Sequence, residues 1–293
     1  MIDHATKISS EHIARYHRDG AVLISNVLGA EDLRLLELGV EEAYRNPGRR
    51  NSIVRGKDGE GETLVETSPS HRSAALRALL DRGTCAAIAG HVMQTPSTQL
   101  VFEQIFYKAK GRIVPTPWHQ DTPFLRLRGY DMCRVWLSCD YSPADITVQM
   151  VRGSHRWNVV YSTQTETQAQ IVQTDARAEY GFDNLGDQNL PIAPDVARYQ
   201  DSFDILRFDV QPGDALVFQG NMLHGASGLE SWDRPRRAFA TMWGGPNLRY
   251  HRPTGKAFPV PGRSDESIPD GAPIGTYEGA FPVGWRALDS RES

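Results

Sequence analysis

Residues 98–250 consist of short apolar runs separated by turn residues, and this pattern constrains the fold more than any other feature of the sequence. The runs are rich in β-branched and aromatic residues, which favour strands. The expected strands cover residues 99–108, 133–139, 147–151, 208–210, 215–218 and 237–243. Many short strands at this spacing are typical of a sandwich or jelly roll. The sequence therefore predicts a mainly β (α+β) fold with a β-sandwich or jelly-roll core.

The first 97 residues have a different, mostly helical pattern. Ser9 or Ser10 can cap a helix that Gly20 ends, and residues 21–24 form a short apolar run. Apolar residues then recur at helical spacing over 33–43. Two further helices are expected over residues 71–80 and 85–93. The helices thus precede the core and flank it.

Three segments lack a clear periodic pattern. Residues 46–63 are charged and Gly-rich, which predicts a mobile loop, and residues 158–206 form a polar insertion that suggests a lid or an entrance loop. The Pro-rich tail, residues 251–293, is expected to be irregular. Its aromatic residues can pack the tail onto the body; they are Phe258, Tyr277, Phe281 and Trp285. With no internal repeat or linker, residues 1–293 are expected to form a single domain.

Composition excludes several classes of function. The 293 residues are 40% hydrophobic and carry 32 Lys+Arg against 36 Asp+Glu, a formal net charge of −4. Without a basic excess or a long apolar stretch, nucleic acid and membranes are not expected partners. The start of the chain lacks the pattern of a secretory signal, so a cytoplasmic location is expected. The sequence leaves a homo-oligomer open.

The cysteines point to a reducing compartment. Cys85, Cys133 and Cys139 are odd in number, so at least one thiol is free. Cys133 and Cys139 lie in one expected strand, roughly 20 Å apart and beyond disulfide reach. All three are expected to be small buried hydrophobes.

Two histidines and an aspartate form a candidate metal site. In an extended backbone His119 and Asp121 face the same side while Gln120 faces away. His224 follows the strand expected over 215–218 and supplies a second imidazole. This set holds Fe(II) on one face and leaves adjacent positions open, whereas Zn(II) with these ligands would favour hydrolysis. The alternative is a solvated loop histidine beside a turn aspartate.

Arg236 supplies a candidate anion site. It opens the strand expected at 237–243, and an arginine that faces into a β-barrel needs an anion as its partner. A dicarboxylate such as 2-oxoglutarate fits, because its 2-oxo acid end can chelate iron while its distal carboxylate reaches Arg236. Arg237 is expected to face outward. In the alternative, Arg234, Arg236 and Arg237 form a basic turn.

Four short motifs occur in order along the chain, at residues 117–123 (PWHQDTP), 151–157 (VRGSHRW), 224–226 (HGA) and 236–238 (RRA). Together, over roughly residues 8–250, they resemble the phytanoyl-CoA dioxygenase family of Fe(II)/2-oxoglutarate oxygenases. The resemblance implies a double-stranded β-helix (jelly-roll or cupin-like) core. It further implies iron(II) on His119, Asp121 and His224, 2-oxoglutarate on Arg236, and O2 as co-substrate.

The resemblance also implies roles for three other residues. Trp136 and Gln104 would line the co-substrate pocket; the alternative for Trp136 is an ordinary core aromatic. His155 lies in a turn that the family uses structurally. Family members often place the arginine eleven residues after the second histidine, where this chain has Pro235, which suggests a one-residue insertion within 229–234. Asparagine is common where this chain has Leu229.

The implied reaction is hydroxylation of an aliphatic C–H bond with release of succinate and CO2. Related halogenating enzymes carry a small residue where this chain has Asp121, so hydroxylation is favoured over halogenation. Desaturation, epoxidation and ring formation remain open, as do an acyl-CoA substrate, a metal-dependent cupin without 2-oxoglutarate, and a non-catalytic jelly roll. A small molecule of specialised metabolism is the expected substrate. Arg134, Phe124 and Arg126 are expected to help shape its pocket.

Overall fold

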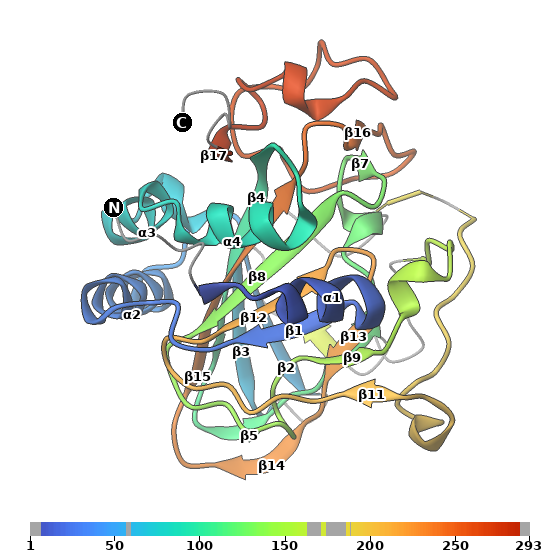
Figure 1. The fold of residues 1–293 in the computed structure, drawn as a ribbon. Helices are drawn as coiled ribbons and strands as arrows, with labels where there is room; N and C mark the ends of the chain where they lie inside the picture. Colours follow the sequence, from blue (N-terminus) through green and yellow to red (C-terminus); the bar gives the residue numbers. More distant parts are fainter. Residues whose placement is uncertain (1–6, 57–59, 163–170, 174–185, 188, 288–293) are drawn as a thin grey trace.

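The computed structural model describes residues 7–56, 60–162, 171–173, 186–187 and 189–287. Within these residues the chain forms antiparallel sheets and a group of helices on one side of the largest sheet (Figure 1). The α-helices are α1 (Ser10–Asp19), α2 (Ala30–Arg45), α3 (Ala74–Asp81) and α4 (Thr84–Met93). None of these helices has the length and apolar composition that crossing a bilayer would require.

The largest sheet has the strand order β1-β12-β8-β15-β4-β3-β2-β10, and β17 pairs with the start of β4. Its strands are β1 (Ala21–Ile24), β2 (Asn51–Gly56), β3 (Glu62–Thr67), β4 (Ser97–Lys108), β8 (Met132–Ser138), β10 (Ile171–Gln173), β12 (Ala215–Gln219), β15 (Arg236–Gly244) and β17 (Val283–Arg286). From β1 to β4 the neighbouring strands come from distant parts of the chain, as expected for a jelly roll, whereas β4, β3 and β2 follow one another in sequence.

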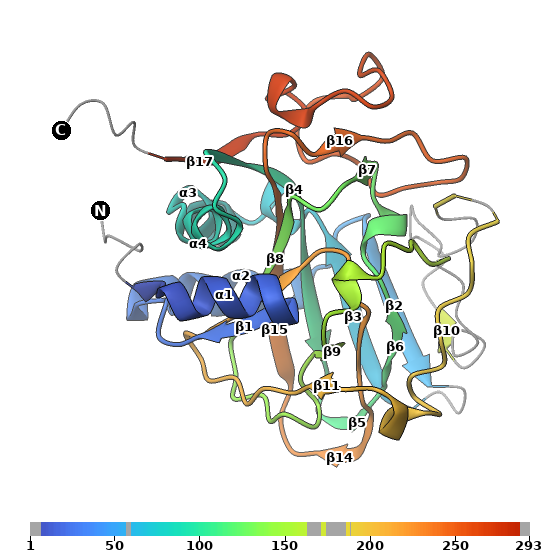
Figure 2. The ribbon, with the colours of Figure 1, turned by 45° about the vertical axis from the view of Figure 1, so that its right-hand side comes forward.

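A second sheet has the order β11-β9-β13-β6. Its strands are β6 (Thr116–His119), β9 (Gln149–Val151), β11 (Ile205–Leu206) and β13 (His224–Ala226). Two short pairs complete the fold; they are β5 (Gly111–Ile113) with β14 (Leu229–Trp232) and β7 (Leu127–Arg128) with β16 (Arg249–Tyr250). Figure 2 shows the helices on one side of the large sheet and β6 and β9 on the other.

The side chains of β8 point alternately to the two faces of the large sheet, which packs against the helices on one face and the second sheet on the other. Cys133, Val135 and Leu137 belong to the core that the sheet shares with the helices. Trp136, between them, belongs to the core that also contains Met150 of the second sheet. Since successive side chains of a strand point to opposite faces, one strand supplies both cores. The site described below lies on the inner face, between the two sheets.

The predicted jelly-roll core is confirmed, and so are the early helices. Ser9 caps α1 by accepting a hydrogen bond from the His12 N–H at 3.2 Å, and Gly20 ends it with a left-handed φ of +90°. The three cysteines are free thiols and buried. The tail aromatics also pack on the body, with Phe281 1% exposed.

Three expectations were wrong in part. Residues 51–56 form β2 and residues 62–67 form β3, although a loop was predicted over residues 46–63. Strand β2 pairs with β3, and β3 pairs with one edge of β4, which supplies hydrogen-bond partners that the local pattern does not reveal. Residues 208–210 contribute only an isolated bridge between Val210 and Ser142. The tail is not wholly irregular, since β17 joins β4.

The predicted lid, residues 158–206, lies partly outside the described residues, at 163–170, 174–185 and 188. Two described parts of it reach the sheets. Strand β10 pairs with β2, and β11 pairs with β9. A lid role for residues 158–206 stays a prediction, and so does the single-domain organisation of residues 1–293.

Candidate metal centre

The two histidines of the candidate site lie side by side on adjacent strands of the second sheet. His119 ends β6 and pairs in register with His224 of β13, which places their ring centroids 4.3 Å apart. His119 Nδ1 lies 2.6 Å from the carbonyl oxygen of Pro117, and His224 Nδ1 lies 3.0 Å from that of Met222. A carbonyl oxygen only accepts hydrogen bonds, so each proton sits on Nδ1 and each Nε2 presents a lone pair.

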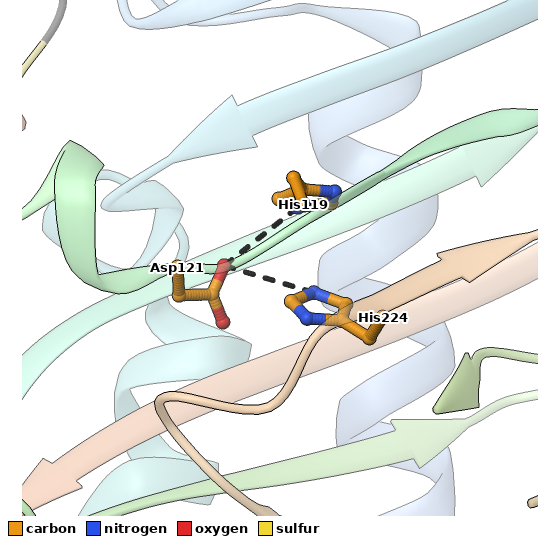
Figure 3. A group of neighbouring side chains, drawn as sticks. All are labelled: His119, Asp121 and His224. Carbon is orange, nitrogen blue, oxygen red and sulfur yellow. Dashed lines mark ion pairs between the residues drawn. The ribbon is translucent and has the colours of Figure 1, made fainter. Parts of the chain in front are cut away.

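Asp121 completes the cluster (Figure 3). Its Oδ1 lies 3.9 Å from His119 Nε2 and 3.8 Å from His224 Nε2. Within the described ranges, this is the group of three potential metal ligands whose donor atoms all lie within 4.8 Å of one another. The expected convergence is confirmed, but its expected cause is wrong in part. Strand β6 ends at His119, and Asp121 has helical backbone angles at the start of a 3-10 turn.

Burial and mutual proximity keep the three groups in the protonation states that a metal requires. Burial, followed by the neighbouring His119, lowers the pKa of His224 to about 3, and burial also lowers the pKa of His119. Burial favours the neutral form of Asp121, but Arg134 and the two histidines outweigh this effect and lower its pKa. At neutral pH the site therefore offers two neutral imidazoles and one carboxylate.

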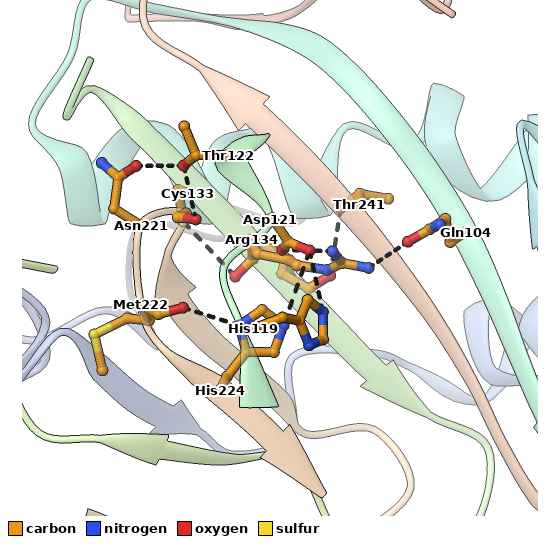
Figure 4. A network of polar contacts seen from close by, with 12 residues as sticks. Gln104, His119, Asp121, Thr122, Cys133, Arg134, Asn221, Met222, His224 and Thr241 are labelled. Carbon is orange, nitrogen blue, oxygen red and sulfur yellow. Dashed lines mark hydrogen bonds and ion pairs between the residues drawn. The ribbon is translucent and has the colours of Figure 1, made fainter. Parts of the chain in front are cut away.

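Arg134 of β8 holds the other oxygen of that carboxylate (Figure 4). Its Nη1 donates to Asp121 Oδ2 at 2.6 Å, and its Nη2 donates to Gln104 Oε1 at 2.8 Å. Gln104 in turn donates from Nε2 to Thr67 Oγ1 at 3.1 Å. The guanidinium also lies over the ring of Phe102, 4.9 Å from its centroid.

Arg236 lies on the inner face of β15, 3% exposed. Its guanidinium lies 5.5 Å from the ring centroid of Trp136, and in the described part of the chain its Nε and Nη1 have no hydrogen-bond partner. Burial lowers the pKa of Arg236 to about 10, which leaves the side chain charged at neutral pH. A buried cation with unsatisfied N–H groups is a site prepared for an anion.

A second buried cation lies beside it. Lys108 of β4 pairs in register with Arg236 and is 1% exposed. Its Nζ donates to the carbonyl oxygen of Val114 at 2.7 Å and to Thr116 Oγ1 at 3.2 Å. Burial, reinforced by the charge of Arg236, lowers the pKa of Lys108 well below its usual value.

The other residues singled out in the sequence lie as follows. Gln104 and Trp136 flank Ala240 of β15 on its two neighbouring strands, so both face the interior. His155 lies outside the metal cluster, with Nε2 3.2 Å from the carbonyl oxygen of His17, in the turn begun by Gly153. Gln120 points away from the cluster, donating to the carbonyl oxygens of Val159 and Asn221.

Arg237 faces the opposite side of β15 from Arg236, as its place in the sequence predicted. Helix α2 covers it there, however, and it pairs with Asp140 and Glu41. Strand β14 has an irregular register against β5 between Leu229 and Trp232, within the segment where an extra residue was expected.

The sequence reasoning did not find Arg134 as a partner of Asp121, nor Lys108 at all. A signal existed for both. Each is a long basic side chain at an inward, buried position of a strand, where a charge is costly without a partner. What the pattern could not supply was the partner, because Asp121 and Arg134 meet only when the two sheets pack.

Comparison with known proteins places the chain in a family. The model of the family described as phytanoyl-CoA dioxygenase (PhyH) matches residues 16–238. No curated protein matches the chain. Solved structures that resemble it include the epimerase SnoN in complex with Fe3+, alpha ketoglutarate and nogalamycin RO, at 20% identity and a TM-score of 0.67, covering 97% of this chain and 100% of that one.

Two further structures are similar. The carbocyclase SnoK from nogalamycin biosynthesis is 19% identical with a TM-score of 0.65, covering 95% of this chain and 97% of that one. EctD from S. alaskensis with 2-oxoglutarate and 5-hydroxyectoine is 15% identical with a TM-score of 0.61, covering 90% and 86%. These likenesses establish the fold. Because the family model spans most of the 293 residues, the chain belongs to the phytanoyl-CoA dioxygenase family of iron(II)- and 2-oxoglutarate-dependent oxygenases.

Proposed function

We propose that this oxygenase binds iron(II) through His119, Asp121 and His224 and anchors the distal carboxylate of 2-oxoglutarate on Arg236. The observation that carries the proposal is the convergence of two Nε2 atoms and one carboxylate oxygen within 4.8 Å. Two neutral imidazoles and a carboxylate on one face match the donor set of non-haem iron oxygenases. The residues present therefore fit the metal.

The surroundings of Arg236 fit the co-substrate. Its buried Nε and Nη1 lack partners among the described residues, and a carboxylate would satisfy two N–H groups at once. Trp136 packs against the guanidinium and keeps water from its face. The neighbouring Lys108 is a second basic side chain on the same face of the sheet, because it pairs in register with Arg236.

Iron(II) with 2-oxoglutarate supplies the activation of O2 and the oxidation of a C–H bond, with release of succinate and CO2. The chain orients these partners. The carbonyl oxygens of Pro117 and Met222 fix the ring orientation of the two histidines. Asp121 occupies the position that a halide would need, which favours hydroxylation over halogenation.

The substrate is expected to reach the metal from the side of His119. The His119 side chain is 20% exposed, against 8% for Asp121 and 7% for His224. On that side Phe124 meets the His119 ring edge-on, and Phe258 of the tail stacks on Phe124. We propose a small molecule of specialised metabolism as the substrate. This class is supported by SnoN with bound nogalamycin RO, by SnoK from nogalamycin biosynthesis and by EctD with bound 5-hydroxyectoine.

The test is an anaerobic titration of the iron(II)-loaded protein with 2-oxoglutarate. A weak visible charge-transfer band is expected as the 2-oxo acid chelates iron. The band should be lost in His224→Ala, and in Arg236→Met it should need a much higher 2-oxoglutarate concentration. A folded, iron-loaded wild type without the band would overturn the proposal.

The substrate class is tested separately. Succinate release above the uncoupled background is measured with a panel of polycyclic, cyclic amino acid and acyl-CoA compounds. Stimulation by the first two groups supports the proposal. Turnover restricted to acyl-CoA would refute the proposed substrate class while leaving the metal site intact.

A further inference from the structure

The two oxygens of Asp121 face different partners. Oδ1 faces the Nε2 atoms of both histidines, at 3.9 Å and 3.8 Å. Oδ2 faces away from them and accepts from Arg134 Nη1 at 2.6 Å, a short charge-assisted hydrogen bond. Figure 4 shows the guanidinium lying between Asp121 and Gln104. The carboxylate is thus divided between the metal position and an arginine.

Arg134 itself has little freedom to move. Its side chain is 4% exposed, and Nη2 donates to Gln104, which is held by Thr67. The rings of Phe102 and Phe106 lie 4.9 Å and 5.6 Å from the guanidinium carbon. Any rotation of Asp121 that brought Oδ2 toward the metal position would break the bond to a donor that cannot follow.

A purely structural reason for this ion pair is weak. Burying both charges costs more desolvation free energy than their attraction commonly returns, and an apolar pair of similar volume is often as stable. The residues that pair in register with Arg134 on the two neighbouring strands are apolar, Phe218 on β12 and Met242 on β15. A charged residue at this position therefore has to be explained by what it does to Asp121.

We propose that Arg134 is a positioning residue that reserves Oδ2 of Asp121 for itself, so that Asp121 binds iron through Oδ1 alone. A carboxylate bound through one oxygen leaves the metal one more open position than a chelating carboxylate does. That position matters because 2-oxoglutarate occupies two positions and O2 needs another. Arg134 also withdraws negative charge from the ligand. The inference rests on the proposed function, since it assumes that Asp121 is a metal ligand.

The test counts water molecules on the metal in the holoprotein. Mn(II) serves as a redox-stable probe, and line broadening of its electron paramagnetic resonance spectrum in ¹⁷O-enriched water reports the number of bound waters. In Arg134→Met the bound Mn(II) is expected to carry one water molecule fewer than in the wild type, because Oδ2 of Asp121 becomes free to bind the metal as well. Arg237→Met, which alters an arginine on the opposite face of β15, should keep the wild-type number. Equal numbers in Arg134→Met and wild type would overturn the inference.

A second experiment remains informative if Arg134→Met folds poorly. The variant Asp121→Gly opens a place where added formate can bind. The double variant Asp121→Gly/Arg134→Met removes both charges of the buried ion pair, so no unpaired charge is left in the interior to destabilise the fold. Formate is expected to tighten Mn(II) binding to Asp121→Gly by about tenfold. It should have little effect on the double variant, because the guanidinium that would hold it is gone. An equal effect of formate on both variants would refute the role of Arg134.

The outcomes separate this inference from the proposed function. Wild-type protein that fails to bind Mn(II), or Asp121→Gly that binds it as tightly as the wild type, would remove the proposed metal site. Mn(II) binding that depends on Asp121 but is indifferent to Arg134 would remove only the positioning role.

Discussion

Arg236 and Arg237 are consecutive in β15, yet their side chains lie on opposite faces of the sheet and have opposite surroundings. Arg236 is buried against Trp136 with two nitrogen atoms lacking partners in the described structure. Arg237 donates to Asp140 at 2.7 Å and to Glu41 of helix α2 at 2.9 Å. One arginine is ready for an added anion, and the other is already neutralised.

This difference predicts contrasting effects of two matched substitutions. Arg236→Met should weaken 2-oxoglutarate binding by about tenfold to a hundredfold, the value of charge-assisted hydrogen bonds to a carboxylate. Isothermal titration of the Mn(II)-loaded protein measures the dissociation constant. Arg237→Met should leave that constant unchanged but lower the free energy of unfolding, because Asp140 and Glu41 lose their partner. The reverse pattern would assign the anchor to Arg237.

Metal binding should raise thermal stability through the same three ligands. A ligand at about a hundred times its dissociation constant contributes about 2.7 kcal/mol to the native state. For a chain of this size the melting temperature should rise by roughly 5–10 °C with Mn(II), as measured by scanning calorimetry. His224→Ala should retain its fold and lose this rise. A full rise in His224→Ala would exclude His224 as a ligand.

Asp19 at the end of α1 predicts a pH-dependent contribution to stability. Hydrogen bonds from Arg18, with a further contribution from Arg152, lower the pKa of Asp19 in the folded protein. A depressed folded-state pKa stabilises the protein above the unfolded value of 3.8 and ceases to do so as the pH falls through the folded value. Asp19→Asn should therefore cost up to about 1 kcal/mol at pH 7.

The check on Asp19 is denaturant unfolding of wild type and Asp19→Asn at several pH values. The difference between their free energies of unfolding should shrink as the pH drops below about 4. A difference that stays constant down to pH 2 would show that the ion pairs do not link folding to protonation here.

The contact between helix α4 and the C-terminal strand gives a packing prediction. A Cβ atom at Gly90 would lie 2.3 Å from the ring of Trp285. Alanine is favoured over glycine in a helix by about 1 kcal/mol, but overpacking costs about 1–3 kcal/mol. Gly90→Ala should therefore destabilise the protein. In a Trp285→Leu background the same change should become neutral or stabilising, as a double-mutant cycle in urea can measure.

A sequence pattern predicts a feature of the site only where the residues involved lie in one segment of the chain. Alternation along a strand placed Arg236 inward and Arg237 on the other face, because the side-chain period of two acts within one segment. The same rule predicted that His119 and Asp121 converge, which they do, although Asp121 lies in a 3-10 turn beyond the strand and its direction is set by that turn. His224 was added from its place after the strand expected over 215–218, and the family motifs then supported the set of three.

The pairing of strands that are distant in sequence could not be predicted from such local patterns. Strand β2 pairs with its neighbour β3, β3 pairs with an edge of β4, and β17 pairs with the other end of that edge. No property of residues 62–67 or 283–286 alone predicts their pairing with β4, since β4 is distant from both in sequence.

The sequence by itself determined the jelly-roll class, the early helices, and the ligand types of a non-haem iron site, because hydrophobic period, turn chemistry and donor chemistry are local properties. Only the tertiary structure decided that Arg134 takes one oxygen of Asp121 and that Lys108 lies beside Arg236. Both contacts bring ionisable side chains together where water is excluded, and which of them meet there depends on how separate strands pack against each other.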